Sequence, residues 1–216
     1  MTGNAKLDTR LVLASASPRR RELLSLLGIA FDVRPVDVVE VTGGSRPEIE
    51  AQRLAREKAE AARLVVPEAP ILAADTIVVL DGRILGKPRD GNEAHEMLSA
   101  LRGRSHDVIT AVALIPRATR GILARHSVTS VTMRPYTDAE VAAWIARGNP
   151  FDKAGGYAIQ DASFRPVEYL DGCYCNVMGL PLWPVTEMLR KAGVAVTSRA
   201  EDLLPQCSSC PLRPPS

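Results

Sequence analysis

The most restrictive feature of this sequence is the run ILAADTIVVL at 71–80, which is apolar at nearly every position. A strand with one solvated face alternates apolar and polar residues, whereas a run apolar at successive positions indicates a strand covered on both sides. DG at 81–82 then favours a two-residue hairpin turn into a return strand over 83–87. Hairpins and longer crossovers both occur, so we expect an α/β fold with a mixed β-sheet.

Capping signals and periodicity place the other elements. A buried strand over 10–16 precedes Ser17, a good N-cap, and Pro18 suits the first position of a helix that ends at Gly28. Thr137 and Glu140 have the spacing of a capping box, which starts a helix ending at Gly148. The remaining helices are expected at 46–65, 91–101 and 181–192, the remaining strands at 107–115 and 122–133, and a glycine-containing loop at 150–161.

Length and charge limit the classes of function. The chain has 216 residues, enough for one core or one core split into two lobes, and a net charge of +2, which argues against nucleic-acid or membrane-surface binding. The first ten residues lack the apolar core of a signal peptide and no run is long enough to span a membrane, so we expect a cytoplasmic protein. We expect one catalytic domain over 1–196 and a flexible tail over 197–216.

The segment LVLASASPRRRELLSLLG at 11–28 carries an anion-binding signal. A helix N-terminus presents free amides and the positive end of its dipole, and Ser15 and Ser17 add hydroxyl groups. Cations are unfavourable there, yet three arginines occupy 19–21, which suggests that a bound anion compensates them. Solvated arginines beside a simple cap are the alternative, and we favour a phosphate site.

Two further charges stand at apolar positions. Lys58 lies at the middle of the apolar face of helix 46–65, where an ammonium group needs an anion, either a structural partner or a ligand. Asp75 lies in the doubly covered strand and needs a cation, a metal ion or several donors. Lys87 falls one residue from Asp75 across the hairpin, and the two converge only if pairing ends or bulges near Pro88.

The histidines and cysteines indicate less. His95, His106 and His126 are scattered and support neither a metal cage nor a catalytic triad. Cys173 and Cys175, with Cys207 and Cys210, have the ligand types of a four-thiolate zinc site. However, the first pair has one residue between its cysteines and the second lies in a proline-rich tail, which favours reduced, unliganded thiols. Gln160, in the 150–161 loop, has the donors and acceptor to read the edge of a base.

Five segments together resemble the Maf family of nucleoside triphosphate pyrophosphatases: LVLASASPRRRELLSLLG, ILAADTIVVLDGRILGKPRD, GRSHDVITAV, FDKAGGYAIQD and NVMGLPLWPV. The resemblance covers about residues 10–193. It implies a twisted mixed sheet flanked by helices, with two lobes around a deep cleft, the Maf/ITPase-like fold. It also implies a house-cleaning hydrolase that cleaves nucleoside triphosphates between the α and β phosphates and needs a divalent metal, Mg²⁺ first, with Mn²⁺ or Co²⁺ as alternatives.

The resemblance also implies roles for single residues. Asp75 takes the general-base position and shares the metal with Glu40. Ser15, Arg19, Lys58 and Lys87 fall on phosphate-contacting positions. Arg20, Thr76 and Gln160 match the branch that prefers dTTP and UTP. Cys173 departs from the pattern, since a serine is usual there.

Other hypotheses remain open. The chain could be a nucleotide-binding regulator of septum formation with little turnover, although a positioned base favours an enzyme. The substrate could be a modified base or a purine nucleotide, or the cysteine tail could form a metal-dependent interaction module. The expected partner is a nucleoside triphosphate, with no nucleic acid and no membrane, and a homodimer is consistent with the resemblance.

Overall fold

The computed structural model describes residues 10–38, 45–117, 119, 121–198 and 203–214. A seven-stranded mixed sheet runs in the order β2-β1-β3-β5-β6-β7, with β4 paired to β3 outside this path. β1 is parallel to β2 and β3, and all the other pairs are antiparallel. The strands are β1 (Leu11–Leu13), β2 (Phe31–Val33), β3 (Ile71–Leu80), β4 (Arg83–Leu85), β5 (Ser105–Ile115), β6 (Leu123–Met133) and β7 (Val167–Asp171).

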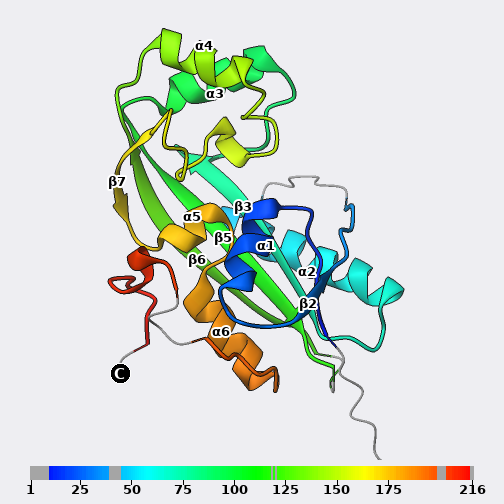
Figure 1. Cartoon of the computed structure of the whole chain (residues 1–216). Helices are drawn as coiled ribbons and strands as arrows, with labels where there is room; N and C mark the ends of the chain where they lie inside the picture. The colour runs from blue at the N-terminus through cyan, green and yellow to red at the C-terminus, as the bar shows by residue number, and fades with distance from the viewer. Residues whose placement is uncertain (1–9, 39–44, 118, 120, 199–202, 215–216) are drawn as a thin grey trace, which may run out of the picture.

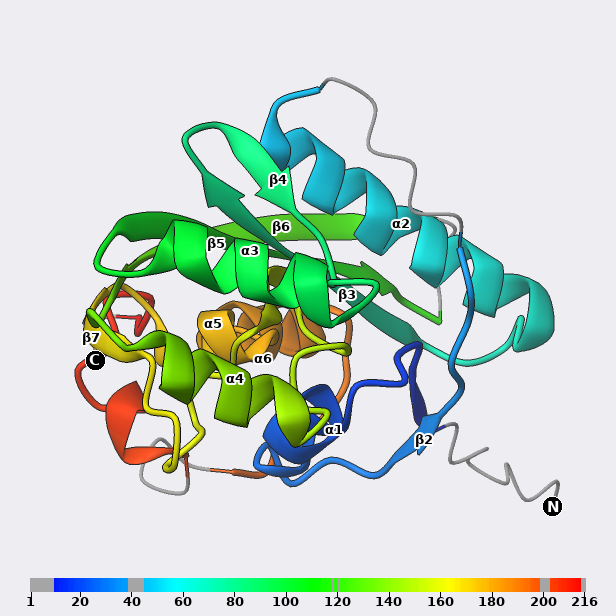
Figure 2. The same ribbon diagram turned by 90° about the horizontal axis from the view of Figure 1, so that it is seen from above.

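Helices cover both faces of this sheet. α2 lies on one face, whereas α1, α5 and α6 lie on the other (Figure 2). The α-helices are α1 (Pro18–Ser25), α2 (Pro47–Val65), α3 (Gly91–Leu101), α4 (Asp138–Ala146), α5 (Tyr174–Met178) and α6 (Leu182–Lys191), and the short 3₁₀ helices are η1 (Ala154–Gly156) and η3 (Pro205–Cys207).

β3 is buried on both sides, as its apolar run predicts. Ile71 and Ala73 pack in the core beneath α2, while Leu72 and Ala74 pack in the core beneath α1, α5 and α6. The α2 side of this layer consists largely of alanine. Ala51, Ala55, Ala59 and Ala62 of α2 are all fully buried there. Short side chains let a helix lie close to a sheet, so α2 is held close to β3 and β5.

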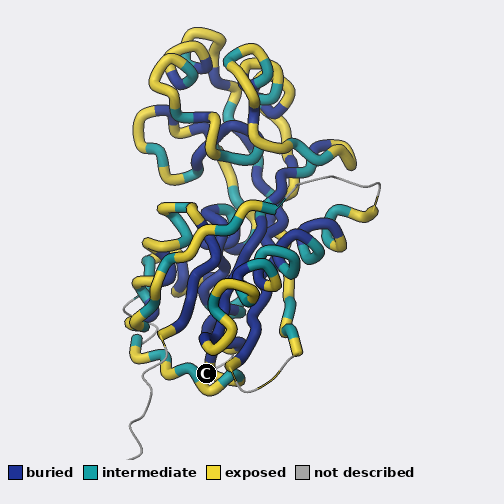
Figure 3. Tube along the Cα trace, turned by 90° about the vertical axis from the view of Figure 1, so that its right-hand side faces the viewer, coloured by how far each residue is buried: buried dark blue, intermediate teal, exposed yellow. Residues whose placement is uncertain are grey.

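The molecule divides into two lobes (Figure 1). One lobe contains the greater part of the sheet with α1, α2, α5 and α6, and the other contains α3, α4 and η1 around a separate core that includes Trp144, Tyr136 and Phe164. Figure 3 shows the buried stretches of chain running through the first lobe and up into the second. This confirms the mixed α/β sheet with flanking helices.

The pairing of β3 explains where the two lobes leave space. β5 pairs with β3 from Ile71 to Val79, whereas on the opposite edge β1 pairs at Ile71 and Leu72 and β4 pairs only from Val78 onward. Among the described strands, nothing pairs with 73–77 on that edge. Side chains from both faces of β3 can therefore reach one opening.

Described parts of the tail contact the body of the protein. Thr197 and Ser198 donate hydrogen bonds to the carbonyl groups of Gly28 and Leu26. Cys207 and Cys210 are buried in the core beneath α5 and α6.

None of the described helices is both long and apolar enough to cross a membrane.

Candidate active site

A cavity of about 710 Å³ opens at the unpaired edge of β3. Every site residue expected from the sequence lines it except Glu40, which lies outside the described residues. The lining includes Ser15, Arg19, Arg20, Lys58, Asp75, Thr76, Lys87 and Gln160. These residues come from five separate segments of the chain, which the fold brings to one place.

The start of α1 forms one wall. Ser17 caps the helix and accepts a hydrogen bond from the Arg20 backbone N–H at 3.4 Å. Arg19 lines the cavity and pairs with Asp152 of the 150–161 loop at 2.9 Å, so it links the two lobes across the cavity. Lys153 also donates to Asp152. Burial opposes ionisation of Asp152, but hydrogen bonds from Lys153 and Arg19 lower its pKa below the usual value.

Asp75 and Lys58 form an ion pair inside the cavity. The Lys58 Nζ lies 2.5 Å from Asp75 Oδ1, and the side chains are 13% and 7% exposed. α2 supplies the lysine from the centre of its apolar face, and β3 supplies the carboxylate from the face that α2 covers. The structural ion pair and the ligand-facing lysine were alternatives in the sequence. In the structure Lys58 both pairs with Asp75 and lines the cavity.

Lys87 reaches the cavity because the β3–β4 ladder ends early. Leu80 pairs with Arg83, as the two-residue turn predicts, but the last pair is Val78 with Leu85. The return strand thus ends before the predicted residue 87, and Gly86 instead accepts a hydrogen bond from the Gly155 N–H at 2.9 Å. Because Lys87 lies beyond the end of the strand, its side chain need not follow the strand's alternating directions, and it lines the same cavity as Asp75.

On the other face of β3, a chain of hydrogen bonds starts at Arg20. Its Nη2 lies 3.0 Å from Thr76 Oγ1, which lies 2.9 Å from Thr110 Oγ1, which in turn donates to the Asn176 carbonyl at 2.7 Å. Arginine has no acceptor, and the Thr110 hydrogen is committed to the carbonyl. The direction is therefore fixed. Thr76 accepts from Arg20 and donates to Thr110.

Two residues in this arrangement were missed from the sequence. Thr110 faces Thr76 across β3 and β5 and is fully buried. Gly179, with φ +108°, accepts from Arg20 Nε at 2.9 Å, and a Cβ there would lie 3.2 Å from Thr76 Oγ1. Glycine is needed for that backbone conformation and close approach. The glycine in MGLP was the available signal, while Thr110 depends on strand register.

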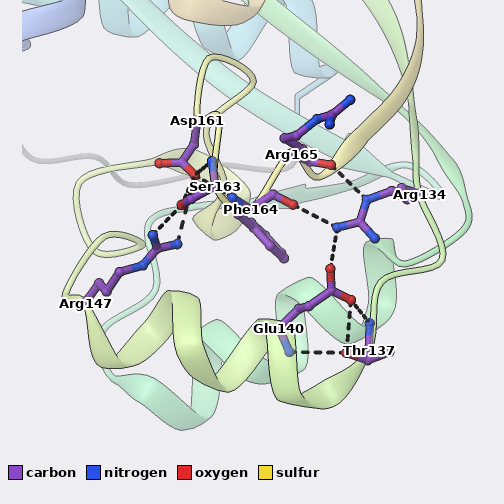
Figure 4. Close-up of polar contacts among 8 residues, drawn as sticks. All are labelled: Arg134, Thr137, Glu140, Arg147, Asp161, Ser163, Phe164 and Arg165. Carbon is purple, nitrogen blue, oxygen red and sulfur yellow. Dashed lines mark hydrogen bonds and ion pairs between the residues drawn. The ribbon is translucent and has the colours of Figure 1, made fainter.

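The loop that carries Gln160 is fixed by the residues immediately after it (Figure 4). Asp161 Oδ1 accepts from the backbone N–H groups of Ser163 and Phe164 at 3.0 and 2.7 Å. Arg134 donates to the carbonyls of Phe164 and Arg165 and pairs with Glu140 of α4. The second lobe therefore holds Gln160 at the cavity wall through these contacts.

His106 and Tyr157 form a buried polar pair behind the cavity. His106 Nε2 lies 2.7 Å from the Tyr157 hydroxyl, and Tyr157 lines the cavity. Burial lowers the pKa of His106 to about 4 and raises that of Tyr157, so both side chains are neutral at pH 7.

The described residues contain no group of three His, Cys, Asp or Glu side chains spaced to hold a metal ion. Mg²⁺, however, is commonly bound by one or two carboxylates together with substrate phosphates and water. Asp75 supplies a carboxylate oxygen at the cavity wall and so fits that oxygen-donor pattern.

A family model and curated relatives match most of the chain. The family model for Maf-like proteins matches residues 10–192. A dTTP/UTP pyrophosphatase of Thermomicrobium roseum is 53% identical over 207 residues, covering 94% of each chain. One of Geobacter metallireducens is 48% identical over 187 residues, covering 86% of this chain and 97% of its own. A solved structure of the Staphylococcus aureus Ham1 protein gives a TM-score of 0.45 at 16% identity, over 74% of this chain and 80% of that one.

Proposed function

This chain belongs to the family of Maf-like proteins, and we propose that it hydrolyses dTTP and UTP to the monophosphate and pyrophosphate. The observation that carries the proposal is one cavity lined by Arg19, Lys58 and Lys87 together with the buried carboxylate of Asp75, which Lys58 contacts directly. Cations from three separate elements suit a polyphosphate. The carboxylate among them suits proton transfer rather than binding alone.

The cationic wall binds the triphosphate in this proposal. The N-terminus of α1 offers backbone N–H groups and the positive end of its dipole, and Ser15 adds a hydroxyl group nearby. Arg19 and Lys58 already hold carboxylates in the structure. Phosphate oxygens therefore replace or join carboxylate oxygens, which carry the same sign of charge. The cost of desolvating Arg19 and Lys58 has already been met in the structure.

Asp75 acts as the general base. Its Oδ1 is held by Lys58, and Oδ2 takes a proton from water as the water oxygen bonds to the α-phosphorus. The bond from the α-phosphorus to the bridging oxygen breaks, and pyrophosphate leaves with the electron pair. A divalent cation, Mg²⁺ first with Mn²⁺ or Co²⁺ as alternatives, would be held by Asp75 and the predicted Glu40 and would neutralise phosphate charge and lower the pKa of the water.

The fixed hydrogen-bond direction bears on base choice. Thr76 has already donated its only hydrogen to Thr110, so toward the cavity its hydroxyl can only accept. Thymine and uracil carry an N3–H donor, whereas cytosine has an unprotonated N3. An accepting hydroxyl therefore favours dTTP and UTP over CTP, with Arg20 positioning Thr76 and Gln160 facing the same cavity.

The test is pyrophosphate release with Mg²⁺ from dTTP, UTP, CTP, GTP and 7-methyl-GTP, with the nucleotide product identified as mono- or diphosphate. We expect monophosphate and a preference for dTTP and UTP. Preference for another nucleotide would contradict the base assignment but not the chemistry. Binding without turnover would favour a nucleotide-binding regulator. A cytoplasmic location, a homodimer and the domain boundary at 196 stay predictions.

A further inference from the structure

All four cysteines of the chain meet beneath α5, although they come from two distant segments. Cys173 and Cys175 lie at the start of α5, and Cys207 and Cys210 lie in the tail, yet each is 6% exposed or less. The Sγ atoms of Cys175 and Cys207 are 3.4 Å apart. The dTTP/UTP hydrolysis proposed above uses none of them.

The thiols contact one another as a chain rather than as two separate pairs. The Cys173 thiol has both Cys175 and Cys210 as hydrogen-bond partners. With the Cys175–Cys207 contact, the order of neighbours is Cys210, Cys173, Cys175, Cys207. The cysteines of this chain are free thiols, and a continuous cluster of four thiols suits one central ion.

The tail turn has the form that zinc ligands take. Cys207 and Cys210 are separated by two residues, and the Cys210 N–H lies 3.4 Å from the Cys207 carbonyl, so the chain turns tightly between them. C-x₂-C turns of this spacing supply paired thiolates in structural zinc sites. Trp183 Nε1 donates to the Cys207 carbonyl at 3.2 Å, which docks this turn on α6.

We propose that Cys173, Cys175, Cys207 and Cys210 bind one structural Zn²⁺ that fastens the C-terminal tail to α5. On binding, the four thiols release four protons and become the four thiolate ligands of a closed tetrahedral site. No three of the described side chains surround a common point as they stand, so the site closes by rotation of cysteine side chains. The ion therefore draws an existing cluster together.

Two neighbours of the proposed zinc ligands connect the ion to the cavity region. The Asn176 carbonyl, one residue beyond Cys175, accepts the last bond of the Arg20–Thr76–Thr110 chain. Gln206, one residue before Cys207, lines a second hollow together with Gln160. Zinc bound to Cys175 and Cys207 would hold the backbone next to both Asn176 and Gln206. Its loss is expected to lower folding stability first and to affect base selection only secondarily.

The test starts from full-length protein purified under reducing conditions, with its zinc content measured by elemental analysis. We expect one zinc per chain, absent from the double variant Cys207→Ser/Cys210→Ser and retained in Ser209→Ala, which changes the exposed residue beside Cys210 and keeps every thiol. The thermal midpoint should fall in the double variant and in native protein treated with a chelator, but not in Ser209→Ala.

A second measurement covers the case in which the double variant does not fold. Native protein freed of zinc is titrated with Co²⁺, and thiolate-to-cobalt charge-transfer absorption of a tetrahedral four-thiolate complex is expected at one equivalent. Three results would each overturn the proposal: no uptake of Zn²⁺ or Co²⁺ by the reduced chain, full zinc content in a folded double variant, or cysteines joined as disulfides in the purified protein.

Discussion

The two sides of the cavity are held together in different ways. The ionic side, on the α2 face of β3 and across the cavity mouth, consists of the pairs Lys58–Asp75 and Arg19–Asp152. The hydroxyl side consists of the chain from Arg20 through Thr76 and Thr110 to the Asn176 carbonyl. Adjacent residues of one strand, Asp75 and Thr76, belong to different sides.

This difference indicates which side of the cavity can exchange its partners when a ligand binds. An ion pair exchanges one anion for another without a new charge being buried, so the ionic side can pass its cations to phosphate. The hydroxyl chain has one allowed direction, and reversing it would leave a buried donor or acceptor unsatisfied at a cost of about 1–3 kcal/mol. The ionic side therefore suits chemistry, and the hydroxyl side suits selection.

The largest expected effect lies on the ionic side. Asp75→Asn keeps the shape but removes the proton acceptor, so turnover of dTTP should fall by about 10²–10⁴-fold while nucleotide binding is largely retained. Kinetics and calorimetric titration measure the two effects. Asp81→Asn is the matched control, because it removes an exposed carboxylate from the turn of the same hairpin, where φ of +50° suits asparagine. Near-normal rates in Asp75→Asn would remove Asp75 from catalysis.

The next effect tests the direction of the hydroxyl chain. Thr110→Val removes the group to which Thr76 donates, so the Thr76 hydrogen becomes available for the unprotonated N3 of cytosine. We expect about 1–3 kcal/mol lower folding stability and a smaller ratio of dTTP to CTP hydrolysis. Thr132→Val removes the β6 hydroxyl bonded to Ser105 at the exposed start of β5 and should leave the ratio unchanged. An unchanged ratio in Thr110→Val would show that Thr76 does not discriminate in this way.

A pH measurement addresses the neutral pair behind the hydroxyl side. Burial lowers the pKa of His106 from 6.5 to about 4, so the unfolded chain binds the proton more readily than the folded one between these values. Its contribution to stability is present above pH 6.5 and is lost as the pH falls toward 4, by about 2 kcal/mol between pH 7 and 5.

Urea unfolding at the two pH values measures that loss. His106→Gln should reduce the difference in unfolding free energy between pH 7 and 5, whereas His95→Gln, at an exposed position of α3, should not. If both variants kept the native pH dependence, its source would lie in groups other than His106.

The smallest effect concerns the link across the cavity mouth. Asp152→Asn removes the anion that holds Arg19 and that repels a triphosphate, so KM for dTTP should fall, by about fivefold or less because exposed ion pairs contribute at most about 1 kcal/mol. The change should shrink as salt concentration rises. Glu187→Gln, a change on α6 that breaks an exposed pair with Arg125 of β6, serves as the control. A raised KM would mean that Asp152 positions Arg19 for substrate instead of competing for it.

Elements with strong local signals were predictable from the sequence. The doubly apolar run at 71–80 and the helix at 91–101 have the predicted bounds, and the Thr137–Glu140 capping box is present. β2, β7 and α5 were missed, because elements of three to five residues depend on tertiary contacts more than on their own periodicity.

The candidate site follows the same division. Ser15, Lys58 and Asp75 stood out because a capping pattern or an apolar surrounding made their chemistry conspicuous. Thr110 and Asp152 did not, since a threonine in a strand and an aspartate in a loop are ordinary until the fold sets their neighbours. The burial of the tail cysteines was likewise invisible, because 32 residues separate Cys175 from Cys207.

The alanine layer beneath α2 acts as a spacer of fixed thickness. Ala51, Ala55, Ala59 and Ala62 meet a sheet surface that itself carries Ala73, Ala111 and Ala113. One extra methylene group in this layer would lift the helix and, with it, the amine that reaches Asp75. The small side chains of this layer thus set the distance between Lys58 and Asp75, and apolar residues that contact no ligand control the geometry of the proposed active site.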